Sequence, residues 1–166
     1  MHATTEPAPA NGTRRIDHWF AHYSDDHRNP ANQRIHVFAV PAIVWSVMAL
    51  LWCIPAPGTL FAQGIWAGVA MVAASAFYLR ASRPLAAGLI PLFVLGALGC
   101  AWIASTFGVR TLLATGIAVF VVAWIAQFIG HRVEGRRPSF LTDLVYLMIG
   151  PAWVLAKLYR RLGIRY

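Results

Sequence analysis

The stretch HVFAVPAIVWSVMALLWCI, residues 36–54, decides the fold because it carries no lysine, arginine or acidic side chain over the length of a bilayer. A membrane-spanning helix needs about 20 predominantly apolar residues. Three further segments of this kind follow, at residues 60–79, 85–105 and 112–130, and glycine or proline stands in each break between them. The sequence therefore predicts an all-α integral membrane protein with four transmembrane helices.

The composition of the whole chain agrees with this fold class. Hydrophobic residues make up 58% of the 166 residues and charged residues only 12%, which is too little charge to cover the surface of a soluble domain. We expect a disordered polar tail at residues 1–15 and a single membrane-embedded helical domain over residues 16–166. The net charge of +8 comes without a nucleic-acid recognition motif. We therefore expect membrane lipids as partners and no nucleic acid.

The basic residues are distributed unevenly about the four predicted spans. If the N-terminus is cytoplasmic, only Arg110 of the 14 lysines and arginines faces outside, which leaves 13 inside. A fifth apolar stretch, residues 140–157, contains Asp143 and is broken by Gly150–Pro151. The positive-inside rule predicts that this stretch is a re-entrant or interfacial segment and that both termini are cytoplasmic. The expected location is the bacterial inner membrane, or the endoplasmic reticulum in a eukaryote.

Residues 16–36, IDHWFAHYSDDHRNPANQRIH, carry four of the six histidines. His18 and His22 have the i, i+4 spacing that places two side chains on one face of a helix, and we expect a short N-terminal amphipathic helix here. Asn29–Pro30 breaks that helix. We expect a new helix to begin near Ala31 and to run into the membrane.

Polar side chains recur where the first predicted span begins and the fourth ends. Asn32 and His36 share a helix face, and so do His131 and Glu134 if the fourth helix continues one turn beyond the bilayer. Packing the first span against the fourth would bring His36 and His131 together in one leaflet. Imidazole with carboxylate or amide ligands suits iron, zinc or manganese, so we predict a metal site at the cytoplasmic rim.

Other interpretations remain compatible with these residues. Each histidine can instead be an interfacial side chain that reaches lipid headgroups, as in a non-catalytic lipid-binding protein. Alternatively, His36 and His131 can be the axial ligands of a b-type haem. We interpret the tryptophans, Trp153 among them, as interface anchors and packing residues.

Two motifs of the chain resemble a known family. YSDDHRNPANQRIHVFAVP, residues 23–41, resembles the N-terminal motif of the fungal 2-hydroxy fatty acid dioxygenases and their bacterial relatives. WIAQFIGHRVEGRRPSFLTDL, residues 124–144, resembles the second motif of that family, in which Gln-Phe-Xaa-Gly-His precedes a glutamate, basic residues and proline. The resemblance implies an Fe(II)-dependent membrane enzyme of fatty acid α-oxidation. Such an enzyme takes a long-chain 2-hydroxy fatty acid and O2 and yields the acid one carbon shorter plus CO2.

The resemblance also implies roles for individual residues. It carries over His27, His36 and His131 as iron ligands. Asn32 and Glu134 follow either as additional ligands or as residues that orient the ligands. Tyr23 and Asn29 follow as supporting polar residues. His22, outside the motif, is a further candidate for the first two roles. A 2-hydroxy carboxylate can chelate iron through its hydroxyl and carboxylate oxygens, and we expect Arg132 or Arg136 to steer its carboxylate.

Overall fold

The computed structural model of the chain describes residues 15–25, 27–58, 61–135 and 147–166. Every regular element within these ranges is an α-helix, so the predicted all-α class is confirmed. The helices are α1 (Arg15–Asp25), α2 (Pro30–Cys53), α3 (Ile65–Ala81), α4 (Arg83–Phe107), α5 (Val109–Glu134) and α7 (Ile149–Arg161).

Local chemistry explains where α2 begins. Pro30 occupies the start of the helix, where its missing N–H is not needed. The side chain of Asn29 caps the helix by accepting a hydrogen bond from the backbone N–H of Ala31 at 2.8 Å. The expected helix start near Ala31 is confirmed, and α2 carries Asn32 and His36 in its first two turns.

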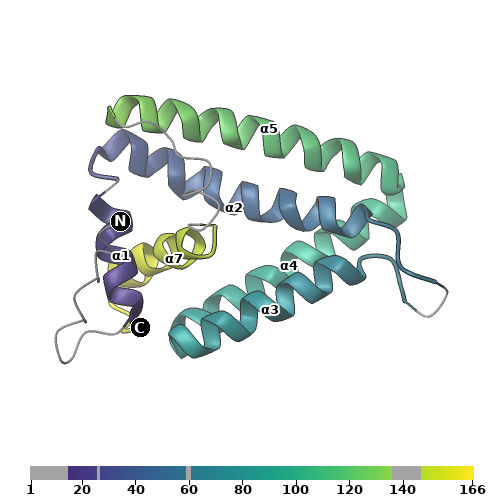
Figure 1. Ribbon diagram of the computed structural model, residues 1–166, viewed down its shortest axis with the longest axis horizontal. Helices are drawn as coiled ribbons and strands as arrows, with labels where there is room; N and C mark the ends of the chain where they lie inside the picture. Colours follow the sequence, from purple (N-terminus) through teal and green to yellow (C-terminus); the bar gives the residue numbers. More distant parts are fainter. Residues whose placement is uncertain (1–14, 26, 59–60, 136–146) are drawn as a thin grey trace, which may run out of the picture.

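The helices α2 and α5 lie side by side and form the most extensive pair among the described helices (Figure 1). Small residues allow this close approach. A Cβ atom added to Gly116 would lie 3.2 Å from Cβ of Ala49, and one added to Gly130 would lie 2.3 Å from Oδ1 of Asn32. The predicted packing of the first span against the last is confirmed, and the start of α2 meets the end of α5.

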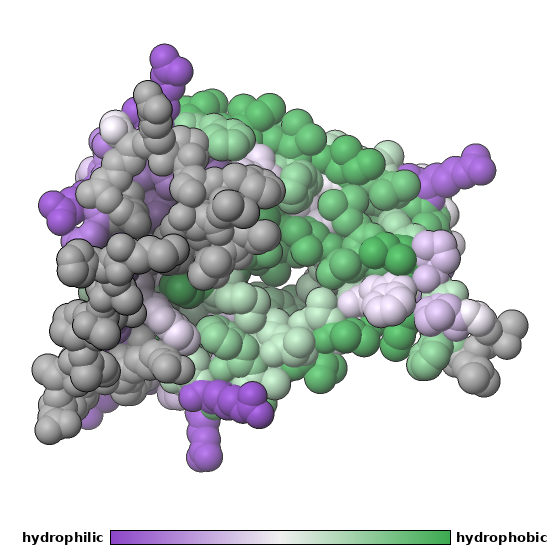
Figure 2. Space-filling model, in the orientation of Figure 1, coloured by the Kyte–Doolittle hydropathy of each residue, from purple (hydrophilic) through white to green (hydrophobic). Residues whose placement is uncertain are grey.

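In the part of the chain that the structure describes, three helices are long and apolar enough to cross a membrane, namely α2, α4 and α5. The helix α3 is also apolar, but it has only 17 residues and begins at Ile65, later than the predicted span of residues 60–79. Large apolar side chains such as Phe38, Trp102 and Val122 are exposed, and Figure 2 shows an extended hydrophobic surface over the body of the molecule. An exposed apolar surface of this extent indicates contact with lipid.

The helix α7 packs against α1, α2 and α4 at the end of the molecule where α2 begins (Figure 1). Pro151 lies in its first turn, where proline is tolerated. Gly150–Pro151, expected to break an apolar segment, therefore stands at the beginning of a helix. Of the predicted segment 140–157, residues 140–146 lie outside the described residues, as does the predicted tail up to residue 14.

Candidate metal centre

Three histidines from separate segments converge at this end of the molecule. His27 lies in the loop after α1, His36 in the second turn of α2, and His131 in the last turn of α5. One ring nitrogen of each lies within 4.8 Å of the other two, a group that can hold a metal ion. All three residues are buried, with exposed fractions of 1%, 0% and 6%. The structure thus brings together the three histidines that the resemblance implies as ligands.

Backbone carbonyl groups orient two of these imidazoles. Nδ1 of His27 lies 2.6 Å from the carbonyl oxygen of Tyr23, and Nδ1 of His36 lies 3.0 Å from the carbonyl oxygen of Asn32. Because a carbonyl oxygen only accepts hydrogen bonds, each Nδ1 carries a proton and donates it. Nε2 of each neutral ring is left with a lone pair, the form in which histidine binds a metal.

The Nε2 atoms of His27 and His36 face each other at 3.0 Å. With both Nδ1 atoms protonated, two nitrogen lone pairs meet in a buried site, and such an arrangement calls for a cation. A shared proton would create a buried imidazolium, which is costly. A metal ion satisfies both nitrogens and takes His131 as a third ligand. This donor set fits iron, zinc or manganese.

Aromatic rings close one side of the cluster. The ring of Tyr23 stacks on His27 with centroids 4.2 Å apart, and the indole of Trp153 lies 5.8 Å from the His27 ring. Trp153 is only 1% exposed, and its Nε1–H donates to Oγ of Ser24 at 2.9 Å. Trp153 is therefore a packing residue and not an interface anchor, because α7 folds back against α1.

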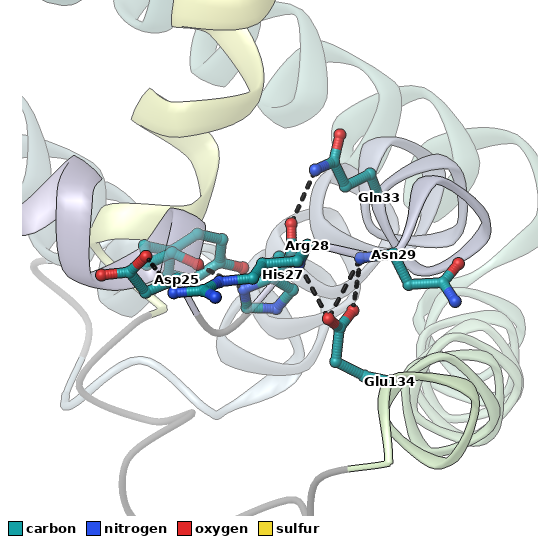
Figure 3. Close-up of polar contacts among 7 residues, drawn as sticks. Asp25, His27, Arg28, Asn29, Gln33 and Glu134 are labelled. Carbon is teal, nitrogen blue, oxygen red and sulfur yellow. Dashed lines mark hydrogen bonds and ion pairs between the residues drawn. The ribbon is translucent and has the colours of Figure 1, made fainter.

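The carboxylate of Glu134 binds the loop that carries His27 (Figure 3). It accepts hydrogen bonds from the backbone N–H groups of Arg28 at 2.9 Å and Asn29 at 2.9 and 3.0 Å, and from Nδ2 of Asn32 at 2.9 Å. These donors lie at the start of α2, where backbone N–H groups lack helical acceptors and a negative charge is favourable. Of the two roles left open for Glu134, its contacts are those of a residue that orients the ligands.

Asn32 is completely buried between α2 and α5. Its Nδ2 donates to Glu134, and its backbone carbonyl holds Nδ1 of His36. Within the described part of the chain, its Oδ1 atom is buried and has no hydrogen-bond partner. Asn32 therefore orients its neighbours and remains a candidate for a further ligand.

Comparisons with known proteins identify the family of the chain. The family described as "2-hydroxy-palmitic acid dioxygenase Mpo1-like" matches residues 13–162. The chain belongs to this family. A curated relative, the 2-hydroxy-palmitic acid dioxygenase MPO1 of Saccharomyces cerevisiae, is 30% identical over 145 residues, which cover 85% of this chain and 78% of the relative. No solved structure matches. The resemblance that the two motifs carry is therefore confirmed.

The remaining predicted residues of this Mpo1-like chain have different positions. His22 is not in it: its side chain is exposed on α1, and its ring contacts that of His18 with centroids 4.6 Å apart. Asn29 caps α2. Arg132 is exposed on the last turn of α5, and Arg136 lies outside the described residues.

Two residues beside the cluster escaped the sequence analysis. Nε2 of Gln33 donates to the backbone carbonyl of His27 at 2.6 Å, and Nζ of Lys157 donates to Oε1 of Gln33 at 2.6 Å. Lys157 also lies 3.9 Å from the centroid of the Trp153 ring. Gln33 lies one helical turn before His36 and inside the motif of residues 23–41, and this position could have identified it as a candidate site residue. Lys157 carries no such signal, because only the folding of α7 brings it there.

Proposed function

We propose that the protein is an Fe(II)-dependent dioxygenase of fatty acid α-oxidation. It converts a long-chain 2-hydroxy fatty acid and O2 into the acid one carbon shorter, CO2 and water. The reaction balances without an added reductant: the C1–C2 bond breaks, four electrons pass from the acid to O2, and C2 becomes the new carboxyl carbon. The observation that carries the proposal is the buried three-histidine cluster in a membrane-type helical chain of the Mpo1-like family.

The histidine cluster is the proposed iron site. Nε2 of His27, Nε2 of His36 and a ring nitrogen of His131 would hold the metal, and iron would supply the activation of O2 that oxidative cleavage requires. The carbonyl groups of Tyr23 and Asn32 keep two of the imidazoles in the binding tautomer. Such outer partners typically influence metal affinity by about 10- to 100-fold.

Neighbouring side chains protect and hold this arrangement. The rings of Tyr23 and Trp153 exclude water from one side of His27. Glu134 and Asn32 tie the end of α5 to the start of α2, which keeps His131 beside the other two histidines. The cluster therefore combines imidazoles in the tautomer that binds a metal with surrounding contacts that limit their movement.

The haem alternative is less well supported by the geometry. If His36 and His131 were axial ligands, a porphyrin plane would have to pass between them. Their ring centroids are 5.1 Å apart, and the ring of His27 packs against both, at 4.3 and 5.3 Å. A porphyrin would have to displace His27 and break its contact with Tyr23.

The proposed setting is a membrane crossed by four helices, with α3 as the fourth. Its 17 residues span about 26 Å at 1.5 Å per residue, which is close to the ~30 Å hydrocarbon core. In this arrangement α1, α7 and the histidine cluster lie on the cytoplasmic side, and α7 lies at the interface without crossing. The charge distribution described above supports this orientation.

Mass spectrometry of lipid products tests the proposed activity. Iron-loaded protein with O2 should convert 2-hydroxypalmitate to pentadecanoate. Palmitate should be converted poorly because it lacks the second chelating oxygen, and a missing chelating group in a site built for it typically costs several kcal/mol. If folded, metal-bound protein leaves 2-hydroxypalmitate and a panel of other 2-hydroxy acids unchanged, the proposed activity is wrong.

A further inference from the structure

A groove runs between α2, α4 and α7, on a different face of α2 from His36. Its volume is about 520 Å³, which lies within the ~300–1,000 Å³ range of small-molecule sites. It is lined by side chains of α2 between Pro30 and Met48, of α4 between Leu89 and Gly96, and of α7 between Pro151 and Arg161. None of them is acidic.

The two ends of the groove differ in chemistry. Its polar side chains are concentrated at the start of α2 and on α7, where Arg34, Lys157 and Arg161 supply positive charge. From Val37 onward the α2 lining is apolar, as is the α4 side. This distribution complements a ligand with an anionic head and a hydrocarbon tail.

The length of the groove also suits an acyl chain. The 14 residues that separate Arg34 from Met48 along α2 correspond to about 21 Å at 1.5 Å per residue. A lipid acyl chain spans one leaflet, roughly 15 Å of the ~30 Å hydrocarbon core. Beyond Met48 and Phe93 the groove adjoins a smaller apolar cavity of about 140 Å³, which both residues also line. These two buried side chains therefore stand between the groove and additional apolar space.

The cationic end of the groove is connected to the metal centre. Lys157 donates to Gln33, and Gln33 donates to the backbone carbonyl of His27. Burial lowers the pKa of Lys157, and the nearby charges of Arg160 and Arg161 lower it further. Within the described residues no acidic side chain is recorded as a partner of Lys157. An anionic ligand would offset this uncompensated positive charge.

We propose that this groove binds the long-chain acid before it reaches the metal centre, with its carboxylate at Arg34, Lys157 and Arg161 and its tail between α2 and α4. Chelation of iron then requires the carboxylate to leave these side chains. The identity of the acid as substrate rests on the proposed function. In this proposal, side chains on α2 and α7 recognise the carboxylate, in place of Arg132 and Arg136, which were expected from the sequence. Met48 and Phe93 limit the length of the bound tail.

Binding is measured without turnover, on metal-bound protein in the absence of O2, with palmitate that carries bromine near its methyl end. Bromine quenches tryptophan fluorescence on contact, and Trp45 in the groove is the reporter. The saturable part of the quenching should disappear in a Trp45→Phe variant, whereas surface tryptophans such as Trp102 are quenched only in proportion to the total brominated acid. A double variant, Arg34→Gln with Lys157→Met, should bind the acid at least tenfold more weakly, because charge-assisted hydrogen bonds to the carboxylate are lost.

Matched controls separate the groove from general charge effects. Arg83→Gln removes an exposed positive charge that does not line the groove and should leave the affinity for the acid unchanged. The brominated methyl ester has no charge, so it should bind the wild-type protein and the double variant equally. Phe93→Ala opens the groove to the smaller cavity and should raise the affinity of a 20-carbon acid relative to a 16-carbon acid.

The outcomes distinguish this proposal from the proposed function. Unchanged acid affinity in the double variant, or saturable quenching that survives Trp45→Phe, would overturn the groove assignment even if the enzyme is active. If the protein binds the acid as described but converts no 2-hydroxy acid, the proposed dioxygenase activity is wrong and the proposed binding groove still holds. If both hold, the double variant should raise KM for 2-hydroxypalmitate about tenfold with the iron content unchanged.

Discussion

At the scale of single residues, His27 and His36 are oriented by the same device, a carbonyl oxygen four residues earlier. The carbonyl of Tyr23 lies in the last turn of α1, where helical carbonyls lack a partner, and the backbone N–H of His27 bonds to Ser24 instead. The imidazole of His27 therefore bonds to a carbonyl at the helix end that the backbone N–H of His27 does not use. For His36, the carbonyl of Asn32 belongs to the continuing helix α2 and accepts Nδ1–H with its second lone pair.

The first prediction at this scale concerns metal binding. His36→Ala or His131→Ala should abolish bound iron, because each removes one of few ligands and opens the site to water. His22→Ala is the matched control, since His22 lies outside the cluster, and it should keep the wild-type iron content. Elemental analysis of the purified variants is the measurement. Full iron occupancy in both cluster variants would refute the assignment.

At the scale of elements, the pairing of α2 with α5 creates the site. His36 and His131 are 95 residues apart in the sequence, and they meet because the two helices pack closely over small residues. Gly130 is the tightest point, because an added Cβ atom would meet Asn32 at 2.3 Å and Cε1 of His36 at 3.6 Å. Asn32 cannot move away freely, since its Nδ2 is bonded to Glu134.

Substitution of Gly130 by alanine tests this pairing. Overpacking typically costs about 1–3 kcal/mol, which exceeds the roughly 0.5–1 kcal/mol that alanine gains over glycine inside a helix. Gly130→Ala should therefore lower the thermal stability and weaken iron retention. Gly68→Ala, in α3 with nothing within 4 Å of the added atom, should be neutral or stabilising. Equal melting temperatures and iron contents for the two variants would contradict the role of Gly130.

At the scale of the whole molecule, an apolar body carries its polar chemistry at one end. The helices α1 and α7 lie at that end together with the histidine cluster (Figure 1). The cationic end of the groove lies there too, because its residues come from the start of α2 and from α7. A single side of the membrane would therefore hold the metal centre, the acid-binding groove and most of the basic residues.

The corresponding prediction is that four helices cross the membrane and both termini are cytoplasmic. It rests on the placement of 13 of the 14 basic residues on one side, with only Arg110 on the other. Reporter fusions at the C-terminus and in the loop between α4 and α5 should report opposite sides. A C-terminus on the outer side would refute the four-span arrangement.

Much of this architecture follows from local patterns in the chain. Runs of apolar residues identify α2, α4 and α5, since every helix in lipid must satisfy its own backbone and cover itself with apolar side chains. Asn29 and Pro30 mark the start of α2 through capping. The length of α3 was overestimated, because apolar residues such as Phe61 continue into the connection before it and hydropathy alone does not mark a helix end. The metal cluster was predictable in part, because the histidines stand at the ends of spans whose pairing the topology favours.

Other parts of the site depend on contacts between segments distant in the sequence. The spacing of Glu134 in the sequence is compatible with either a metal ligand or a residue that orients the ligands. Only the folded structure shows that its carboxylate accepts hydrogen bonds from the backbone of Arg28 and Asn29. In the sequence, Trp153 and Lys157 are residues of an apolar segment with no sign of a role in the site. Their place beside the histidine cluster follows from the packing of α7 against α1 and α2. Hydropathy and helical spacing report the environment along one element, whereas the partners of a side chain depend on how whole helices pack against one another.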